Sequence, residues 1–125
     1  MKRNLTITSL LGIIAIMLGA FGAHALKEKL GPEALQSFET GVRYQMYHVI
    51  VLLFVNTYSG FSTKTKDRIS LLFFVAILFF SGSIYAISTG IIMAKSIWFI
   101  TPLGGLLFIV GWLLMLIEFI KRDRA

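Results

Sequence analysis

Two histidines are the residues of this chain best suited to chemistry. His24 and His48 are its only histidines, and each lies close to one end of a long apolar segment. An imidazole titrates near neutral pH, ligates transition metals and relays protons. On two neighbouring helices, such a pair could bind haem or a metal, form a proton or ion path, or make structural hydrogen bonds between helices.

Further polar side chains are expected at the same level, near the outer surface of a membrane. Polar and ionisable groups at membrane depth are costly and are often functional. We therefore predict one polar cluster that a function of the protein itself would use. Its members are His24, Arg43, Tyr44, Tyr47, His48, Tyr85 and Thr101.

Four stretches without Asp, Glu, Lys or Arg must position these residues: Asn4–Leu26, Tyr44–Thr63, Ile69–Ala94 and Ser96–Ile117. A membrane-spanning helix needs about 20 mostly apolar residues. Charged residues make up 14% of the chain, against about 25% in soluble domains. The sequence thus predicts an all-α, single-domain, antiparallel bundle of four transmembrane helices, with spans at about 5–25, 44–62, 69–90 and 101–120.

The basic residues predict the orientation of these spans. Eight of them fall on one side of a four-span chain and four on the other, and the richer side faces the cytoplasm. Both termini are therefore expected inside. The cytoplasmic group is Lys2, Arg3, Lys64, Lys66, Arg68, Lys121, Arg122 and Arg124, and the outer group is Lys27, Lys29, Arg43 and Lys95.

The first apolar run also resembles a secretory signal, because Met1, Lys2 and Arg3 precede it and Ala23-His24-Ala25 resembles a cleavage site. Its apolar run is longer than the usual signal core of about 7–15 residues. We expect it to be retained as the first span.

A short amphipathic helix is predicted outside the membrane, between the first two spans. Gly31-Pro32-Glu33 is typical of a helix start, with proline at the first helical position. This helix either continues into the second span or bends near Gly41. Arg43 either pairs with Glu39, four positions earlier, or holds a lipid phosphate or a partner's carboxylate.

The outer ends of the last two spans carry helix-ending and helix-starting residues. Gly90 is expected to end one helix, and Thr101-Pro102 to start the next. The segment between them is then interfacial, with Trp98 at the headgroups. Glu118 is expected to pair with Lys121 or Arg122, and Asn56 to hydrogen-bond a neighbouring helix.

Small residues at helical spacing predict how the helices pack. Helices in lipid associate through close contact of small residues rather than through the hydrophobic effect. These seams are expected to hold the bundle together, or to offer one face to another protein. They comprise Gly12, Ala15, Gly19, Gly22, Ala76, Ser83, Ala86, Gly90, Gly104, Gly105 and Gly111.

Four segments carry a family resemblance: GAFGAHALKEKL at 19–30, FETGVRYQMYHVIVLL at 38–53, SGSIY at 81–85 and TPLGGLLFIVGW at 101–112. Together they resemble the small membrane family called domain of unknown function 423, which is related to the eukaryotic transmembrane protein 256 group. The resemblance implies a four-helix inner-membrane protein of uncharacterised function. It supports retention of the first span and implies no catalytic residues.

The sequence therefore predicts a non-enzymatic accessory protein of the plasma membrane, without cofactor or metal. Its expected partners are the lipid bilayer and another membrane protein or a second copy. Nucleic acid is not expected, because the basic residues lie at the ends of spans. The alternatives are transport of an ion, proton or small lipophile through the His24/His48 cluster, and haem or quinone binding.

Overall fold

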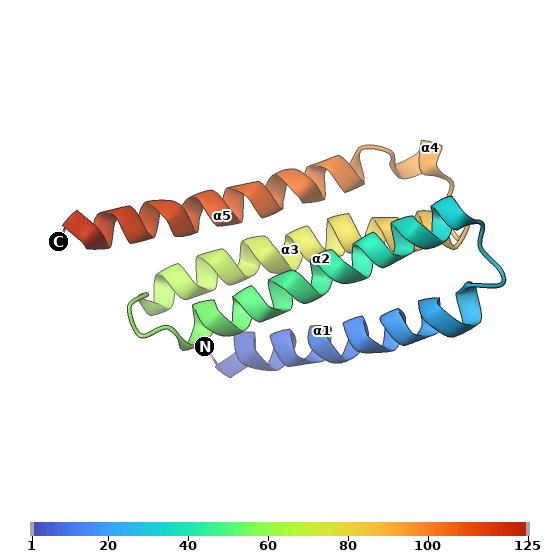
Figure 1. The fold of residues 1–125 in the computed structure, drawn as a ribbon. Helices are drawn as coiled ribbons and strands as arrows, with labels where there is room; N and C mark the ends of the chain where they lie inside the picture. The colour runs from blue at the N-terminus through green and yellow to red at the C-terminus, as the bar shows by residue number, and fades with distance from the viewer. Residues whose placement is uncertain (1, 125) are drawn as a thin grey trace.

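A computed structural model describes the backbone of residues 2–124 and the side chains up to residue 122; Met1 and the side chain of Arg124 lie outside this part. Within residues 2–124 the regular elements are helices joined by short turns, and there is no strand, as predicted. The elements, drawn in Figure 1, are α1 (Lys2–Phe21), the π-helical η1 (Gly22–Leu26) that continues it, α2 (Pro32–Thr57), α3 (Thr63–Ser88), the short α4 (Ala94–Ile97) and α5 (Ile100–Arg124).

The long helices run antiparallel to their neighbours in a bundle in which α1 and α5 occupy opposite edges (Figure 1). α2 packs against α1 and α3, and α5 packs against α3. α1 begins and α5 ends at the same end of the bundle, where α2 also turns into α3. The largest apolar core lies among α2, α3 and α5, around buried Leu52, Phe73, Phe108 and Met115.

Three helical segments are long and apolar enough to cross a membrane: Lys2–Leu26, Thr63–Ser88 and Ile100–Arg122. α2 has 26 residues, as many as α3, but does not meet the same criterion because it is more polar. Its polar residues Gln45, His48 and Asn56 are all buried. α2 can carry them because its neighbours, rather than lipid, surround them.

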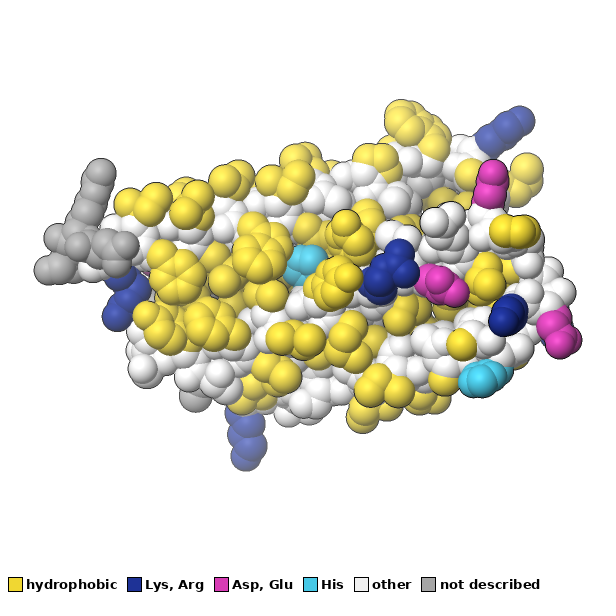
Figure 2. Space-filling view, in the orientation of Figure 1, with side chains coloured by type: hydrophobic (Ala, Val, Ile, Leu, Met, Phe, Trp, Pro, Cys, Tyr) yellow, Lys and Arg dark blue, Asp and Glu magenta, His cyan; other side chains and the backbone are white. Residues whose placement is uncertain are grey.

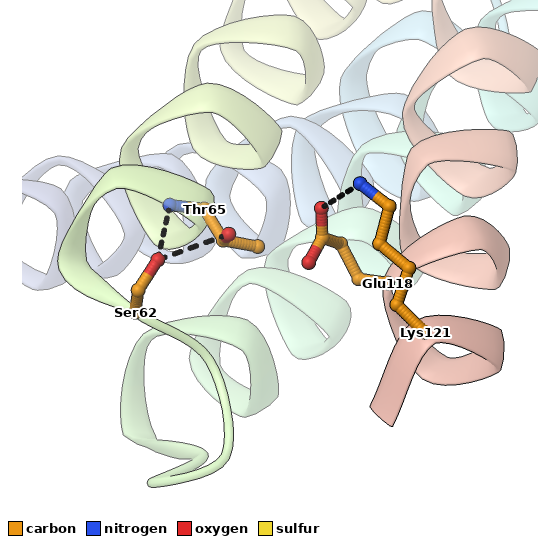
Figure 3. Close-up of polar contacts among 4 residues, drawn as sticks. All are labelled: Ser62, Thr65, Glu118 and Lys121. Carbon is orange, nitrogen blue, oxygen red and sulfur yellow. Dashed lines mark hydrogen bonds and ion pairs between the residues drawn. The ribbon is translucent and has the colours of Figure 1, made fainter. Parts of the chain in front are cut away.

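The first turn of α3 is capped by local hydrogen bonds, shown in Figure 3. The side chain of Ser62 accepts a hydrogen bond from the backbone N–H of Thr65 at 3.1 Å, which satisfies one donor of the first turn. At the same end of the bundle, Glu118 and Lys121 of α5 form an ion pair with an N–O distance of 3.8 Å. This is one of the two pairings predicted for Glu118.

The end of α3 and the start of α5 lie close to the predicted positions. α3 ends at Ser88, and Gly90 has a positive φ of 81° that favours glycine. α5 begins at Ile100, so that Thr101 and Pro102 lie in its first turn. Gly90 is not a seam residue, however, because a Cβ built on it would meet nothing within 4 Å.

The expected external amphipathic helix is not a separate element, because α2 continues unbroken from Pro32 to Thr57. Of the two alternatives, the helix that runs straight on is observed. Gly41 does not bend it. Instead, Gly41 lets α3 approach closely: its carbonyl accepts a hydrogen bond from Ser81 at 2.7 Å, and a Cβ there would lie 2.9 Å from the Tyr85 ring.

On α1, the predicted seam faces α2. Cβ atoms built on Gly12 and Gly19 would both lie 3.4 Å from a valine of α2, and one on Gly22 would lie 3.0 Å from the Phe38 ring. Ala15 is buried in the same seam. These contacts show that α1 uses its small residues to lie on α2.

The closest helix crossing joins α5 to α3. A Cβ on Gly104 would lie 2.4 Å from the backbone nitrogen of Phe80, and one on Gly111 would lie 2.5 Å from the Phe73 ring. Gly105 is looser, at 3.8 Å from the Phe80 ring. Ala76 of α3 is buried in the core, whereas Ala86 is only partly buried.

Candidate functional site

His48 is held by two hydrogen bonds in the middle of the bundle. Its Nδ1 lies 2.7 Å from the carbonyl oxygen of Tyr44, and the indole N–H of Trp112 donates to its Nε2 at 3.0 Å. Because Nε2 accepts a hydrogen bond, the proton of the neutral imidazole sits on Nδ1 and is donated to the carbonyl of Tyr44. Both nitrogens are therefore occupied.

Aromatic rings of α3 and α5 enclose the imidazole. Phe108 stacks on it, with ring centroids 3.9 Å apart and planes 21° apart. Phe73 lies 5.0 Å away in a tilted arrangement. A metal or haem could bind Nε2 only by displacing Trp112 from it.

The expected pair of His24 and His48 is not formed. His24 is exposed in η1, beyond the end of α1. Since Gly22 lies against Phe38 and Gly12 against Val49, His24 stands roughly 18 Å along the bundle from His48, at about 1.5 Å per helical residue. The prediction placed His48 near the outer surface because it started the second span at Tyr44, whereas α2 begins at Pro32.

Tyr85 belongs to a second polar site, centred on Gln45. The Tyr85 hydroxyl donates to Oε1 of Gln45 at 2.7 Å, and Nε2 of Gln45 donates to the carbonyl of Leu11 at 2.8 Å. This chain of bonds joins α3, α2 and α1. Sequence reasoning overlooked Gln45, although an amide within an uncharged apolar stretch was a visible signal.

The remaining members of the predicted cluster form no common site, although the Tyr44 and Tyr47 rings touch. The Thr101 hydroxyl of α5 is hydrogen-bonded to Ser83 of α3. The Tyr44 ring packs against Phe80, with centroids 5.0 Å apart, and more loosely against the partly exposed Tyr47. Arg43 is exposed and donates to the Thr40 hydroxyl at 3.0 Å. The predicted cluster thus divides into separate contacts.

A third polar site joins three helices at the end of the bundle where α1 begins, and Asn56 is its centre. The predicted hydrogen bond of Asn56 to a neighbouring helix is therefore confirmed. Asn4 of α1 donates to Oδ1 of Asn56 at 3.0 Å and to Asp67 at 2.8 Å. Asn56 in turn donates to the Ser70 hydroxyl at 2.8 Å. The nearby Thr8 hydroxyl is the one buried side-chain polar atom of residues 2–122 without a hydrogen bond.

The grooves of the bundle are peripheral. One of about 300 Å³ lies between α1 and α3, with apolar walls, and includes Gln45 and Tyr85 in its lining. Another of about 300 Å³ lies between α1 and α2, beside Glu39 and Arg43. Within the described part of the chain, no three His, Cys, Asp or Glu side chains converge in a way that could hold a metal ion.

Comparison with known proteins supplies the family. The family model described as "Protein of unknown function (DUF423)" matches residues 18–105, more than half of the chain. The chain belongs to the DUF423 family. This DUF423 protein is 40% identical to UPF0382 membrane protein SSP2132 of Staphylococcus saprophyticus over 121 residues, which cover 97% of this chain and 99% of the relative.

Two further relatives are also named UPF0382 proteins. The chain is 36% identical to UPF0382 membrane protein YwdK of Bacillus subtilis, with 97% of this chain and 98% of the relative covered. It is 35% identical to UPF0382 inner membrane protein YgdD of Escherichia coli, with 90% and 86% covered. No solved structure shows significant similarity. The DUF423 protein is therefore a membrane protein, and its relatives' names give no activity.

Proposed function

We propose that this DUF423 protein is a non-enzymatic accessory protein of the plasma membrane, which crosses the bilayer four times and packs against a larger membrane complex. The observation that carries the proposal is that buried His48, Gln45 and Asn56 each hydrogen-bond a side chain of another helix. His48 with Trp112, Gln45 with Tyr85, and Asn4 with Asn56 each use their polar atoms to join helices. An enzyme or a carrier needs such groups free to meet a substrate.

The four crossings are supported by the place of α2. α2 lies antiparallel between α1 and α3, which are both apolar enough to span a membrane. Its contacts with α1 run from Phe38 to Val49, and Asn56 reaches the inner end of α1 at Asn4. A helix packed along two spanning helices crosses with them. The basic residues then favour cytoplasmic termini.

The bundle edges supply surface for a partner. α1 exposes Ile13, Ile16 and Met17, and α5 exposes Leu106 and Ile109. Lipid covers such residues in an isolated bundle, and another transmembrane helix can replace the lipid when the shapes fit. Transport through His24 and His48 has less support, because these side chains lie far apart.

The test is capture of the tagged chain after mild crosslinking in intact cells, at its native expression level. The proposal expects one membrane protein at a fixed ratio to the chain, whichever detergent is used. A chain carrying Gly104→Leu, which clashes with the α3 backbone, is the control and should lose the partner. Recovery of the wild-type chain only as itself would sink the proposal.

A further inference from the structure

α2 keeps an exposed stripe although it packs against two helices, α1 and α3. Six of its exposed residues recur at intervals of three and four, which place them on one side of the helix. The same intervals form the seam of two parallel helices. We call these residues the α2 stripe: Gln36, Glu39, Arg43, Tyr47, Ile50 and Phe54.

The inner half of this stripe is apolar and well exposed. Tyr47 is 52% exposed, Ile50 60% and Phe54 44%. Its outer half carries opposite charges, on Glu39 and Arg43. Figure 2 shows a basic and an acidic side chain next to each other on a largely hydrophobic face, on the side toward the end of the bundle that carries further acidic and basic side chains.

Both charges lie at membrane depth. Ser81 of α3 is level with Gly41 of α2, because the two are hydrogen-bonded. Counting from there to Ser88, where α3 ends, Glu39 lies roughly 7 Å and Arg43 roughly 13 Å inside the outer end of α3, at about 1.5 Å per residue. Charges at this depth are expensive unless they are paired or reach the headgroups.

The protein itself does not pair them. Among residues 2–122 the ion pair found is Glu118–Lys121. Glu39 and Arg43 are four positions apart on α2, but they form no salt bridge with each other. Arg43 donates instead to Thr40, a neutral hydroxyl on its own helix. Each charge thus has room for an opposite charge from outside the chain.

A second copy offers both opposite charges at once. Two copies in one membrane have the same orientation, so a two-fold axis between them runs along the membrane normal. Around such an axis, Arg43 of one copy lies about 6 Å along the helix from the level of Glu39 of the other. A side-chain ion pair that spans this offset forms twice, because a two-fold interface repeats every contact. The offset of about four residues is close to that of the charge pairs between parallel coiled-coil helices. A different protein would have to carry the same two charges in matching order.

We infer that two copies of this protein associate in parallel through the α2 stripe, with reciprocal Glu39–Arg43 ion pairs in the outer half and contacts of Tyr47, Ile50 and Phe54 in the inner half. This inference goes beyond the proposed function, since the dimer forms with or without another partner. It requires only that α2 lie in the membrane.

Disulfide crosslinking tests whether the α2 stripe forms the interface between two copies. Introduced cysteines are the only ones present, because the chain has no cysteine of its own. Tyr47→Cys and Ile50→Cys are oxidised in native membranes, beside Leu71→Cys and Leu78→Cys as matched controls on exposed positions of α3. The inference expects chain-to-chain disulfides in the first two variants and few in the controls. Equal crosslinking at all four positions, or crosslinks only to another protein, overturns it.

Charge exchange tests the pairing in the Ile50→Cys background. Arg43→Glu and Glu39→Arg should each lower the crosslinked fraction roughly tenfold or more, because like charges then face each other. The double variant Glu39→Arg/Arg43→Glu restores opposite charges and should recover most of the crosslinking. No loss in the single variants, or no recovery in the double variant, contradicts the ion pairs.

Two controls keep these outcomes distinct. Lys95→Glu, outside the stripe, should leave crosslinking unchanged. If a charge-reversal variant fails to accumulate, Glu39→Gln and Arg43→Gln replace it, and each should lower crosslinking. Partner capture reports on the proposed function separately: a fixed-ratio partner without a chain-to-chain disulfide refutes the dimer alone, and a dimer without a partner refutes the accessory role alone.

Discussion

The indole N–H of Trp112 on α5 donates to Nε2 of His48 on α2 over 3.0 Å. These helices have little direct backbone contact, since α5 packs mainly on α3. The bond therefore joins two helices across a layer of aromatic rings that includes Phe108 and Phe73. It also fixes the neutral imidazole with its proton on Nδ1.

Removal of either partner of this bond should destabilise the bundle modestly. Trp112→Phe and His48→Phe are each expected to lower the free energy of unfolding, with a coupling of about 0.6–1.7 kcal/mol between them, the range for interhelical hydrogen bonds in membranes. Unfolding in mixed micelles measures this through a double-mutant cycle. A coupling near zero would show that the bond contributes nothing to stability.

Loss of Asn56 should be costlier, because its amide joins three helices. Asn56→Leu removes the acceptor of Asn4 and the donor to Ser70. Leaving buried polar groups unpaired costs about 1–3 kcal/mol each, so the transition in the same unfolding assay should move clearly toward lower denaturant. Thr57→Val is the neighbouring control, since the Thr57 hydroxyl is exposed and bonds only its own helix. Equal effects of the two substitutions would refute the central role of Asn56.

Adjacent glycines on α5 should respond differently to alanine. Gly104→Ala places a Cβ 2.4 Å from the backbone nitrogen of Phe80, whereas Gly105→Ala places one 3.8 Å from a ring that can adjust. Overpacking at a rigid contact typically costs about 1–3 kcal/mol. Gly104→Ala should therefore unfold earlier, and Gly105→Ala should stay close to wild type. Comparable unfolding of both variants would argue against the close α3–α5 crossing.

Cysteine labelling measures the number of crossings. With a membrane-impermeant maleimide on intact cells, Glu28→Cys and Ser96→Cys should react, and Ser59→Cys should react only after permeabilisation. Four spans require this pattern, because residue 59 lies in the turn between α2 and α3. Labelling of Glu28→Cys and Ser59→Cys from the same side would mean that α2 does not cross.

The fold was largely predictable, because the length of each uncharged stretch and the residues that end helices can be read from the local sequence. Gly90 and Thr101-Pro102 mark helix ends through backbone geometry, which requires no knowledge of neighbours. The length of α2 was left open between two alternatives, because Glu39 and Arg43 were taken as signs of a helix outside the membrane. Charge alone does not show that Gly41 packs against Tyr85 and continues the helix.

The partners of the polar side chains could not be predicted, because they depend on the register between helices. Shifting His48 by some twelve residues along the bundle separates it from His24 and brings it to Trp112 of α5. Gln45 illustrates the same point: its partners come from α1 and α3, and no spacing within α2 identifies them. The register between α1 and α2 is known only from the structure, in which Gly12 lies against Val49 and Gly22 against Phe38.

The most direct test of the accessory role is native mass spectrometry of the protein released gently from the membrane, with an absorbance spectrum of the same sample. We predict a complex that contains the chain and a second membrane polypeptide in fixed ratio, with no absorbance band beyond those of the aromatic residues. A haem band, or a particle of the chain with a bound small cofactor and no other polypeptide, would contradict it.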